Sequence, residues 1–348
     1  MGDMRGPKKP SMKRRCELHN YRERGIYMIT MSTEGRRPLL GQLAGRANAT
    51  EGADVPHVVL SPLGERVRDC WQDIPKYYPV VEPMKLCIMP DHIHGLLFVH
   101  SQMEKHLGHV IEGFKIGTRK AARELGLLPT RGEESFVPSS STVPYTALIA
   151  QPTQPSRHTA AGRAHGLLWE PGYNDRLLTH KGQLQHMIDY LADNPRRLLL
   201  KRQHPEFFTR LGTITVANVP MEAMGNSFLL NYPVKRQVQC SRSLSSEEIE
   251  ERKRDILQAG REGAVLVSPC ISPGEQQITT AALQAGVPLI VLLLKGFPSF
   301  FKPQPRYLEA CANGKLLMLA PFPWQNEKIG NMRQRCLQLN ALAGSICG

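Results

Sequence analysis

Two apolar runs, 84–89 and 95–99, flank a short polar segment in the string MKLCIMPDHIHGLLFV. Runs of this length around a proline predict two β-strands, and their short connection makes them antiparallel neighbours. Side chains of a strand alternate between its two faces, so His92 and His94 would emerge on one face while Ile93 points to the other. Two imidazoles held at that spacing can chelate one divalent metal ion.

The His-x-His triplet is a weak signal by itself. The chain has 12 histidines in 348 residues, so chance alone gives roughly 0.4 such triplets. The alternative to a metal site is a pair of structural histidines whose ring nitrogens are satisfied by neighbours. A second motif that could take part in the same chemistry must therefore be found elsewhere in the chain before the triplet indicates a metal site.

A second element lies about a hundred residues further on, in the segment GQLQHMIDYLADNP (182–195). Its apolar residues fall at helical spacing and predict one buried stripe, formed by Leu184, Met187, Ile188 and Leu191. Tyr190 and Asn194 are an i,i+4 pair, so they lie on one face at the edge of that stripe. Asn194 also precedes Pro195, and it could instead be the N-cap of a following helix.

The remaining pattern of the first 200 residues predicts an α+β domain. Strands are expected at 25–32 and 57–61, an imperfect helix at 63–77 and an amphipathic helix at 103–126. Residues 42–56 are rich in turn formers and predict a loop. Residues 129–165 are rich in Ser, Thr, Pro and Gly without periodicity, which is typical of a flexible insertion.

The pattern changes after residue 203. Ser245 to Glu248 is a capping box that opens a helix, apolar strands are expected at 264–268 and 288–294, and a third strand is expected at 315–319. Helices at 274–285 and 306–313 separate these strands. Continuous apolar strands that alternate with helices favour a parallel sheet covered on both faces. The second half is therefore expected to be a small α/β Rossmann-like domain.

The chain thus divides into a basic disordered arm at 1–20, a first domain at 21–212 that includes the insertion, and a second domain at 213–348. Lys and Arg number 44 against 31 Asp and Glu, giving a formal charge of +13 and a pI near 9.5. Such a surplus favours a polyanionic partner. No apolar run is long enough to span a bilayer, and the eight cysteines form no Cys-x-x-Cys pair. We expect a cytoplasmic, nucleoid-associated protein, a monomer or homodimer without a membrane partner.

Five segments in order resemble the single-tyrosine HUH transposases, most closely the REP-associated tyrosine transposases of bacteria. They are GIYMITMSTEGRRPLLG (25–41), MPDHIHGLLFV (89–99), FKIGTRKA (114–121), LWEPGYNDRLL (168–178) and IDYLADNP (188–195). The insertion at 129–165 departs from the family, which has a much shorter connection there. The resemblance implies a ferredoxin-like antiparallel-sheet domain that cleaves and rejoins single-stranded or hairpin DNA during transposition.

The resemblance also implies roles for particular residues. Tyr190 would attack the phosphodiester and store its energy as a 5′-phosphotyrosine, so that rejoining needs no ATP. A Mg²⁺ or Mn²⁺ ion on His92, His94 and Asn194 would polarise the scissile phosphate. Two alternatives remain open, because His186 is a rival third ligand and Tyr173 is a rival nucleophile. Asp91 is expected to shape the bend between the strands.

Basic residues would contact the phosphate backbone of the DNA, and the alternative for each is an exposed side chain that contacts only water. The candidates are Arg36, Arg37, Lys115, Arg119, Arg176, Arg196 and Arg197. Two rival functions are a non-catalytic DNA-binding protein that kept the fold, and a nucleotide sensor with a DNA-anchoring first domain.

The second half resembles the DNA-processing-protein and lysine-decarboxylase-like nucleotide-binding folds in the string AVLVSPCISPGEQQI. The phosphoribohydrolases of that group carry a Pro-Gly-Gly-x-Gly-Thr turn, which this chain replaces with Ser-Pro-Gly-Glu at 272–275. Ser272 and Gly274 would lie at a helix N-terminus, where free N–H groups favour an anion. The carboxylate of Glu275 is the alternative occupant of that positive end.

Overall fold

The structure is a computed structural model that describes residues 19–129, 166–299, 301–325 and 329–348. Most of the expected N-terminal arm and nearly all of the expected insertion at 129–165 lie outside these ranges. The chain divides into two compact units, residues 1–199 and 200–348, and each is described by itself. The expected domain boundary at 212/213 falls inside a strand of the second unit, β7 (Arg210–Val216).

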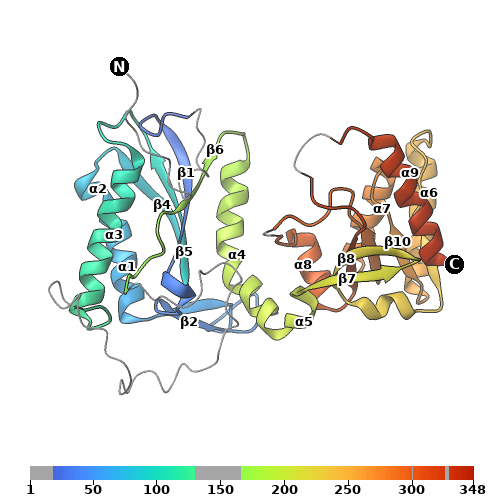
Figure 1. Cartoon of the computed structure of the whole chain (residues 1–348), viewed down its shortest axis with the longest axis horizontal. Helices are drawn as coiled ribbons and strands as arrows, with labels where there is room; N and C mark the ends of the chain where they lie inside the picture. Colours follow the sequence, from blue (N-terminus) through green and yellow to red (C-terminus); the bar gives the residue numbers. More distant parts are fainter. Residues whose placement is uncertain (1–18, 130–165, 300, 326–328) are drawn as a thin grey trace. The chain divides into compact units, whose positions relative to one another are not determined.

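The first unit is built on a four-stranded sheet in the order β4-β5-β1-β6, with every pairing antiparallel. The strands are β1 (Gly25–Ser32), β4 (Val81–Met89), β5 (His92–Val99) and β6 (Asn174–Leu178). Helix α1 (Pro62–Gln72) precedes β4, and α3 (Leu107–Glu124) connects β5 to β6. Chain order and strand order together are those of a ferredoxin-like βαββαβ fold, as the sequence predicts (Figure 1).

Different helices cover the two faces of this sheet (Figure 1). Helices α1 and α3 pack on the face that carries Ile29, Ile93 and Leu97. Helix α4 (Gln183–Gln203) packs on the opposite face through its predicted stripe, with Met187 and Leu191 buried against Met28 and Leu96. Because β5 alternates, its even-numbered residues meet α4 and its odd-numbered residues meet α1 and α3.

Three local expectations need correction. Residues 41–44 form a strand, β2 (Gly41–Ala44), which pairs with β3 (His57–Leu60), whereas the sequence predicts a loop there. The helix expected at 63–77 is two helices, α1 and α2 (Ile74–Tyr77), separated at Asp73. Helix α3 begins at Leu107, four residues after its expected start, because His106 accepts the N–H of Gly108 as N-cap.

Helix α4 continues through Pro195 to Gln203. A proline inside a helix removes one i→i−4 hydrogen bond, and the packing of the apolar stripe offsets that loss. The sequence-based alternative that Asn194 caps a new helix is therefore wrong. Tyr190 and Asn194 lie on the same helix, one turn apart.

The second unit is an α/β domain with a six-stranded sheet in the order β7-β8-β12-β11-β10-β9. The expected strands β10 (Val265–Ser268), β11 (Leu289–Leu292) and β12 (Leu316–Ala320) are parallel, as predicted, and a fourth parallel strand that the sequence did not predict, β9 (Lys235–Gln237), pairs with β10. The sheet is mixed, because the hairpin of β7 and β8 (Val219–Gly225) joins β12 antiparallel. Helices α6 (Ser246–Arg261), α7 (Pro273–Gln284) and α8 (Pro305–Ala312) cover one face, and α9 (Met332–Cys347) covers the other.

The N-terminus of α7 has an internal anion. Glu275 is 2% exposed, and its carboxylate accepts the N–H groups of Ile271 and Ser272 at 2.8 and 3.0 Å. Ser272 donates its hydroxyl to the carbonyl of Cys240, and an added Cβ at Gly274 would lie 2.3 Å from the Cys240 sulfur. The structure therefore does not support an external anion at Ser272 and Gly274. The carboxylate of Glu275 occupies the N-terminus of α7, which was the alternative that the sequence offered.

A close approach at Gly95 supports a stability prediction. A Cβ at Gly95 would lie 2.2 Å from the ring of Trp71, which is completely buried between α1 and the sheet. Gly95→Ala should lower the free energy of unfolding of the first unit by about 2 kcal/mol, or about 4–8 °C in melting temperature. Gly117→Ala is the matched control, because its Cβ would meet only the Cys70 sulfur at 3.5 Å. Equal calorimetric melting temperatures for the two variants would contradict the packing argument.

Candidate functional site: a histidine pair facing the tyrosine helix

His92 and His94 project from β5 onto the α4 face of the sheet, as their spacing predicts. Their ring centroids are 4.8 Å apart, and the rings meet edge to face. His94 is 4% exposed and contacts the Thr30 hydroxyl through Nδ1 at 2.7 Å, across the β1–β5 pairing. Both rings are thus held by backbone that is paired on two sides.

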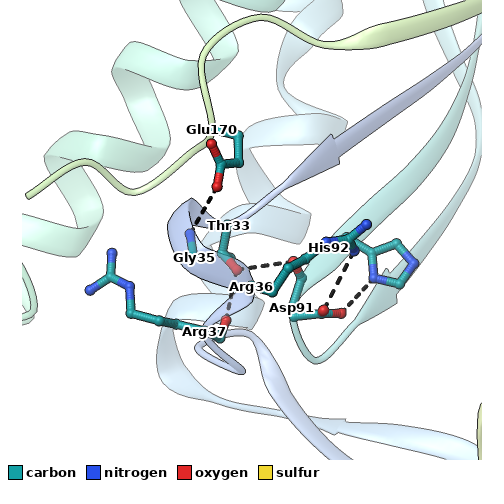
Figure 2. A network of polar contacts seen from close by, with 7 residues as sticks. All are labelled: Thr33, Gly35, Arg36, Arg37, Asp91, His92 and Glu170. Carbon is teal, nitrogen blue, oxygen red and sulfur yellow. Dashed lines mark hydrogen bonds and ion pairs between the residues drawn. The ribbon is translucent and has the colours of Figure 1, made fainter. Parts of the chain in front are cut away.

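Asp91 has a role that the sequence analysis missed. Its Oδ1 lies 2.6 Å from His92 Nδ1, and its Oδ2 lies 3.4 Å from the Arg36 guanidinium (Figure 2). Burial alone would raise the pKa of Asp91, but the hydrogen bond and charge of His92 and the charge of Arg36 lower it below its usual value. An ionised carboxylate can only accept, so Nδ1 of His92 carries a proton, and in the neutral ring Nε2 is then the nitrogen with a lone pair.

The turn after β1 positions Asp91 (Figure 2). Thr33 donates its N–H and its hydroxyl to the Asp91 carbonyl at 2.9 and 3.0 Å. The turn itself is held by the segment 167–172, which we call the strap. Glu170 of the strap accepts the Gly35 N–H at 2.9 Å, and Arg37 donates to the Leu167 carbonyl at 2.7 Å. The spacing of these residues in the sequence gives no sign of this network.

Tyr190 of α4 faces the histidine pair. Its ring centroid lies 6.2 Å from that of His94. Arg197, two turns along the same helix, places its Cζ 5.6 Å from the centroid of the Tyr190 ring. Arg197 is only 5% exposed and lies 3.8 Å from Asp193. The buried, positively charged side chain of Arg197 therefore stacks on the ring of the candidate nucleophile. From the sequence, Arg197 was expected only to contact DNA.

Asn194, the candidate third ligand, lies on α4 one turn after Tyr190. It is 8% exposed, and its Nδ2 is buried without a hydrogen-bond partner among the described residues. Amide oxygen and nitrogen are assigned from their surroundings, so the same position can present the oxygen. Across the described ranges, no three His, Cys, Asp or Glu side chains gather as a metal site. A set with two imidazoles and an amide oxygen is outside that class, and both imidazoles can present Nε2.

The two rival residues differ in position, because only Tyr173 lies on the other side of the sheet. Tyr173 packs on the α1–α3 side of the sheet, away from the histidine pair, and lines a cavity there. His186 is exposed on α4, one turn before Tyr190. The structure brings together His92, His94 and Tyr190 and does not add Tyr173 to them.

The predicted DNA-binding residues fall into two groups. Arg176 of β6 is exposed opposite Met28, so it shares the face of the histidine pair; Arg196 and Arg197 lie on α4, and Arg36 lies beside Asp91. Lys115 and Arg119 lie on α3, behind the sheet, and Arg37 is directed to the strap. Whether any of them contacts DNA stays a prediction.

No family model matches the chain. An uncharacterised protein of Haemophilus influenzae is 25% identical over 130 residues, which are 32% of this chain and 67% of that protein. A solved REP-associated tyrosine transposase bound to a REP hairpin covers 52% of this chain and 72% of its own, at 12% identity and a TM-score of 0.31. A transposase candidate of Deinococcus radiodurans covers 52% and 98%, at 15% identity and a TM-score of 0.27. The likeness concerns the α+β fold alone. None of the helices in the described ranges combines the length and apolarity that a bilayer crossing requires.

Asp91 should tune metal affinity through His92. Asp91→Ala removes the acceptor that fixes the ring, so Mn²⁺ should bind about 10–100-fold more weakly while the protein stays folded. Asp189→Ala is the control, because Asp189 is an exposed α4 residue that accepts a hydrogen bond from Gln185, one turn before it on the helix. Calorimetric titration with Mn²⁺ measures both variants, and equal affinities would contradict the positioning role.

Asn194→Ala separates a ligand from a structural residue. Because Asn194 lies inside a continuous helix and its Nδ2 has no hydrogen-bond partner in the described ranges, alanine should leave the melting temperature unchanged or raise it. The same variant should need more Mn²⁺ for half-saturation. A clear loss of helical circular dichroism without a change in the Mn²⁺ titration would show that Asn194 stabilises the helix and does not bind the metal.

Proposed function

We propose that the first unit cleaves and rejoins single-stranded or hairpin DNA through a covalent link to Tyr190, as part of DNA transposition. The observation that carries the proposal is the approach of Tyr190 to His94 from a helix that seals the opposite side of the site. A phenol, two imidazoles and a buried guanidinium meet on one face of a rigid sheet. Rigid elements hold reacting groups more reproducibly than loops do.

The reaction that we propose conserves the energy of the phosphodiester. The Tyr190 hydroxyl loses its proton, its oxygen bonds to phosphorus, and the 3′ oxygen of the preceding nucleotide leaves. The product is a 5′-phosphotyrosine and a free 3′-hydroxyl. Attack by a 3′-hydroxyl on the same phosphorus reverses these bond changes, which rejoins a strand and returns Tyr190.

The residues of the site have separate roles in this proposal. A Mg²⁺ or Mn²⁺ ion, when bound by His92, His94 and Asn194, supplies charge to the scissile phosphate and the leaving oxygen. Arg197 places a second positive charge beside the attacking phenol, in a buried environment where it stabilises developing negative charge more strongly than in water. Asp91 keeps His92 in the tautomer that can bind a metal.

The strand would approach across the α4 side of the sheet. Arg36, Arg176 and Arg196 stand on or beside that side. Of these, Arg176 is exposed and extends from an edge strand, so it is free of the sheet interior. Phosphate contacts of this kind hold a strand in position and weaken with salt.

The nucleophile is tested with a labelled DNA hairpin that carries a single-stranded foot. Incubation with Mn²⁺ should give a protein–DNA adduct that survives boiling in detergent. Tyr190→Phe should abolish the adduct, because only the attacking oxygen is removed, and should leave DNA binding within about twofold. His92→Ala, His94→Ala and added chelator should abolish it as well.

Tyr173→Phe is the matched control, since it removes the same atom from the other side of the sheet. It should leave the yield of adduct unchanged. An adduct that survives in Tyr190→Phe and disappears in Tyr173→Phe would overturn the assignment. Tight DNA binding by the wild-type chain without any adduct would instead favour the non-catalytic DNA-binding protein.

A further inference from the structure

A cavity of about 280 Å³ lies between α3 and the strap, on the side of the sheet away from Tyr190. Glu112, Lys115 and Arg119 line it from the helix, and Trp169, Pro171 and Tyr173 line it from the strap and the residue that follows. The cavity is partly open to solvent, so a small molecule or one unit of a chain can enter it. None of the chemistry proposed for Tyr190 uses this cavity.

The two cations of the cavity are held by backbone oxygens. Lys115 Nζ donates to the carbonyls of Glu170 and Gly172 at 2.9 and 2.5 Å, which ties α3 to the strap. Arg119 Nε donates to the Lys115 carbonyl, one turn back on the helix. Within the described part of the chain, neither cation has a carboxylate oxygen within 4 Å; Glu170 instead accepts the Gly35 N–H.

This arrangement leaves positive charge without an ionic partner in a partly dry site. Burial is the main cause that lowers the pKa of Lys115, to about 8, and the neighbouring charge of Arg119 lowers it further, against a smaller opposite effect of Glu170. An anion in the cavity would neutralise the repulsion between the two cations and compensate for the lost hydration. The carboxylates of Glu112 and Glu170 also line the cavity, but neither forms an ion pair with Lys115 or Arg119 in the described part of the chain, so the two adjacent cations favour an anionic ligand.

The lining also limits the form of the ligand. The guanidinium of Arg119 can donate two parallel hydrogen bonds to a phosphoryl group, and the Lys115 ammonium has a third N–H beyond the two that the strap accepts. Trp169 is fixed by the hydrogen bond from its Nε1 to Thr118, and it forms a wall with Pro171 and Tyr173. These flat, mostly apolar groups suit a compact organic group attached to the phosphoryl group.

We propose that this cavity is a binding site for a phosphoryl group, carried either by a free phosphate ester such as a nucleoside monophosphate or by a nucleotide of a DNA strand. Both sources present the same tetrahedral anion to Lys115 and Arg119. The site is separate from the cleavage chemistry, so it stands if that proposal fails.

The test measures the affinity of the full chain for inorganic phosphate, AMP and a short single-stranded oligonucleotide. Arg119→Gln removes one cation without touching the strap, and it should weaken binding about tenfold. Lys120→Gln removes the same charge from an exposed residue of the same helix, which pairs with Glu124 at 4.0 Å, and it should have no effect. The Tyr190→Phe background excludes any contribution from covalent adducts.

The pH dependence is a second readout. A phosphate monoester such as AMP remains largely a dianion between pH 7 and 9, while Lys115, with its pKa of about 8, loses its proton over the same range. Affinity should therefore fall as the pH rises from 7 to 9. Lys115→Arg keeps its charge throughout and should remove this fall.

The three ligands identify the source of the phosphoryl group. Saturable binding of phosphate and AMP that weakens in Arg119→Gln supports a free ester. Saturable binding of the oligonucleotide alone, weakened by the same substitution, supports a strand. Equal losses in Arg119→Gln and Lys120→Gln, or no saturable binding of any of the three, would overturn the proposal.

Discussion

The first unit depends on the two-residue alternation of β5. One strand supplies the histidine pair to the α4 side and Ile93, Gly95 and Leu97 to the side of α1 and α3. A shift of its pairing by one residue would bury the imidazoles against Trp71 and expose the core. Pairing on both sides, with β1 and β4, prevents such a shift. Packing and chemistry are therefore specified by the same hydrogen bonds, and the site is as rigid as the centre of the sheet.

Much of this unit could be predicted from local patterns. The strand at 25–32, the hairpin around Pro90 and the stripe of α4 follow from periodicities that a few residues reveal. The role of Asp91 could not be predicted, because it depends on a turn about 55 residues away and on a strap more than 75 residues away. Pro195 wrongly suggested that a new helix begins there, because proline is favoured in the first turn of a helix. The tertiary packing of α4 overrides that local preference, and the helix continues through Pro195.

In the second unit, the sequence predicts the central apolar strands but not the elements at the edges and on the outer face of the sheet. The parallel strands β10, β11 and β12 are apolar runs and were found from the sequence, whereas β7, β8, α9 and the short polar parallel strand β9 were missed. Helix α9 has no strong apolar periodicity, and it is held by Leu339, Leu342 and Ile346 against the sheet. Glu275 was correctly considered as an occupant of the α7 N-terminus. The structure adds that this carboxylate is almost fully buried and ties the loop after β10 to Cys240, so the helix end serves stability.

The position of β6 along the chain has a consequence for synthesis. Strand β1 lies at the middle of the sheet, but the partner on its second side ends at Leu178, 79 residues after β5 ends at Val99. At about 5–20 residues per second, a ribosome needs roughly 4–16 s to make that segment. During this interval a nascent chain that has already paired β1 with β5 presents a bare strand edge, to which other chains can add. Slower translation of this stretch therefore lengthens the period of exposure, and the yield of soluble protein becomes sensitive to codon choice between residues 99 and 178.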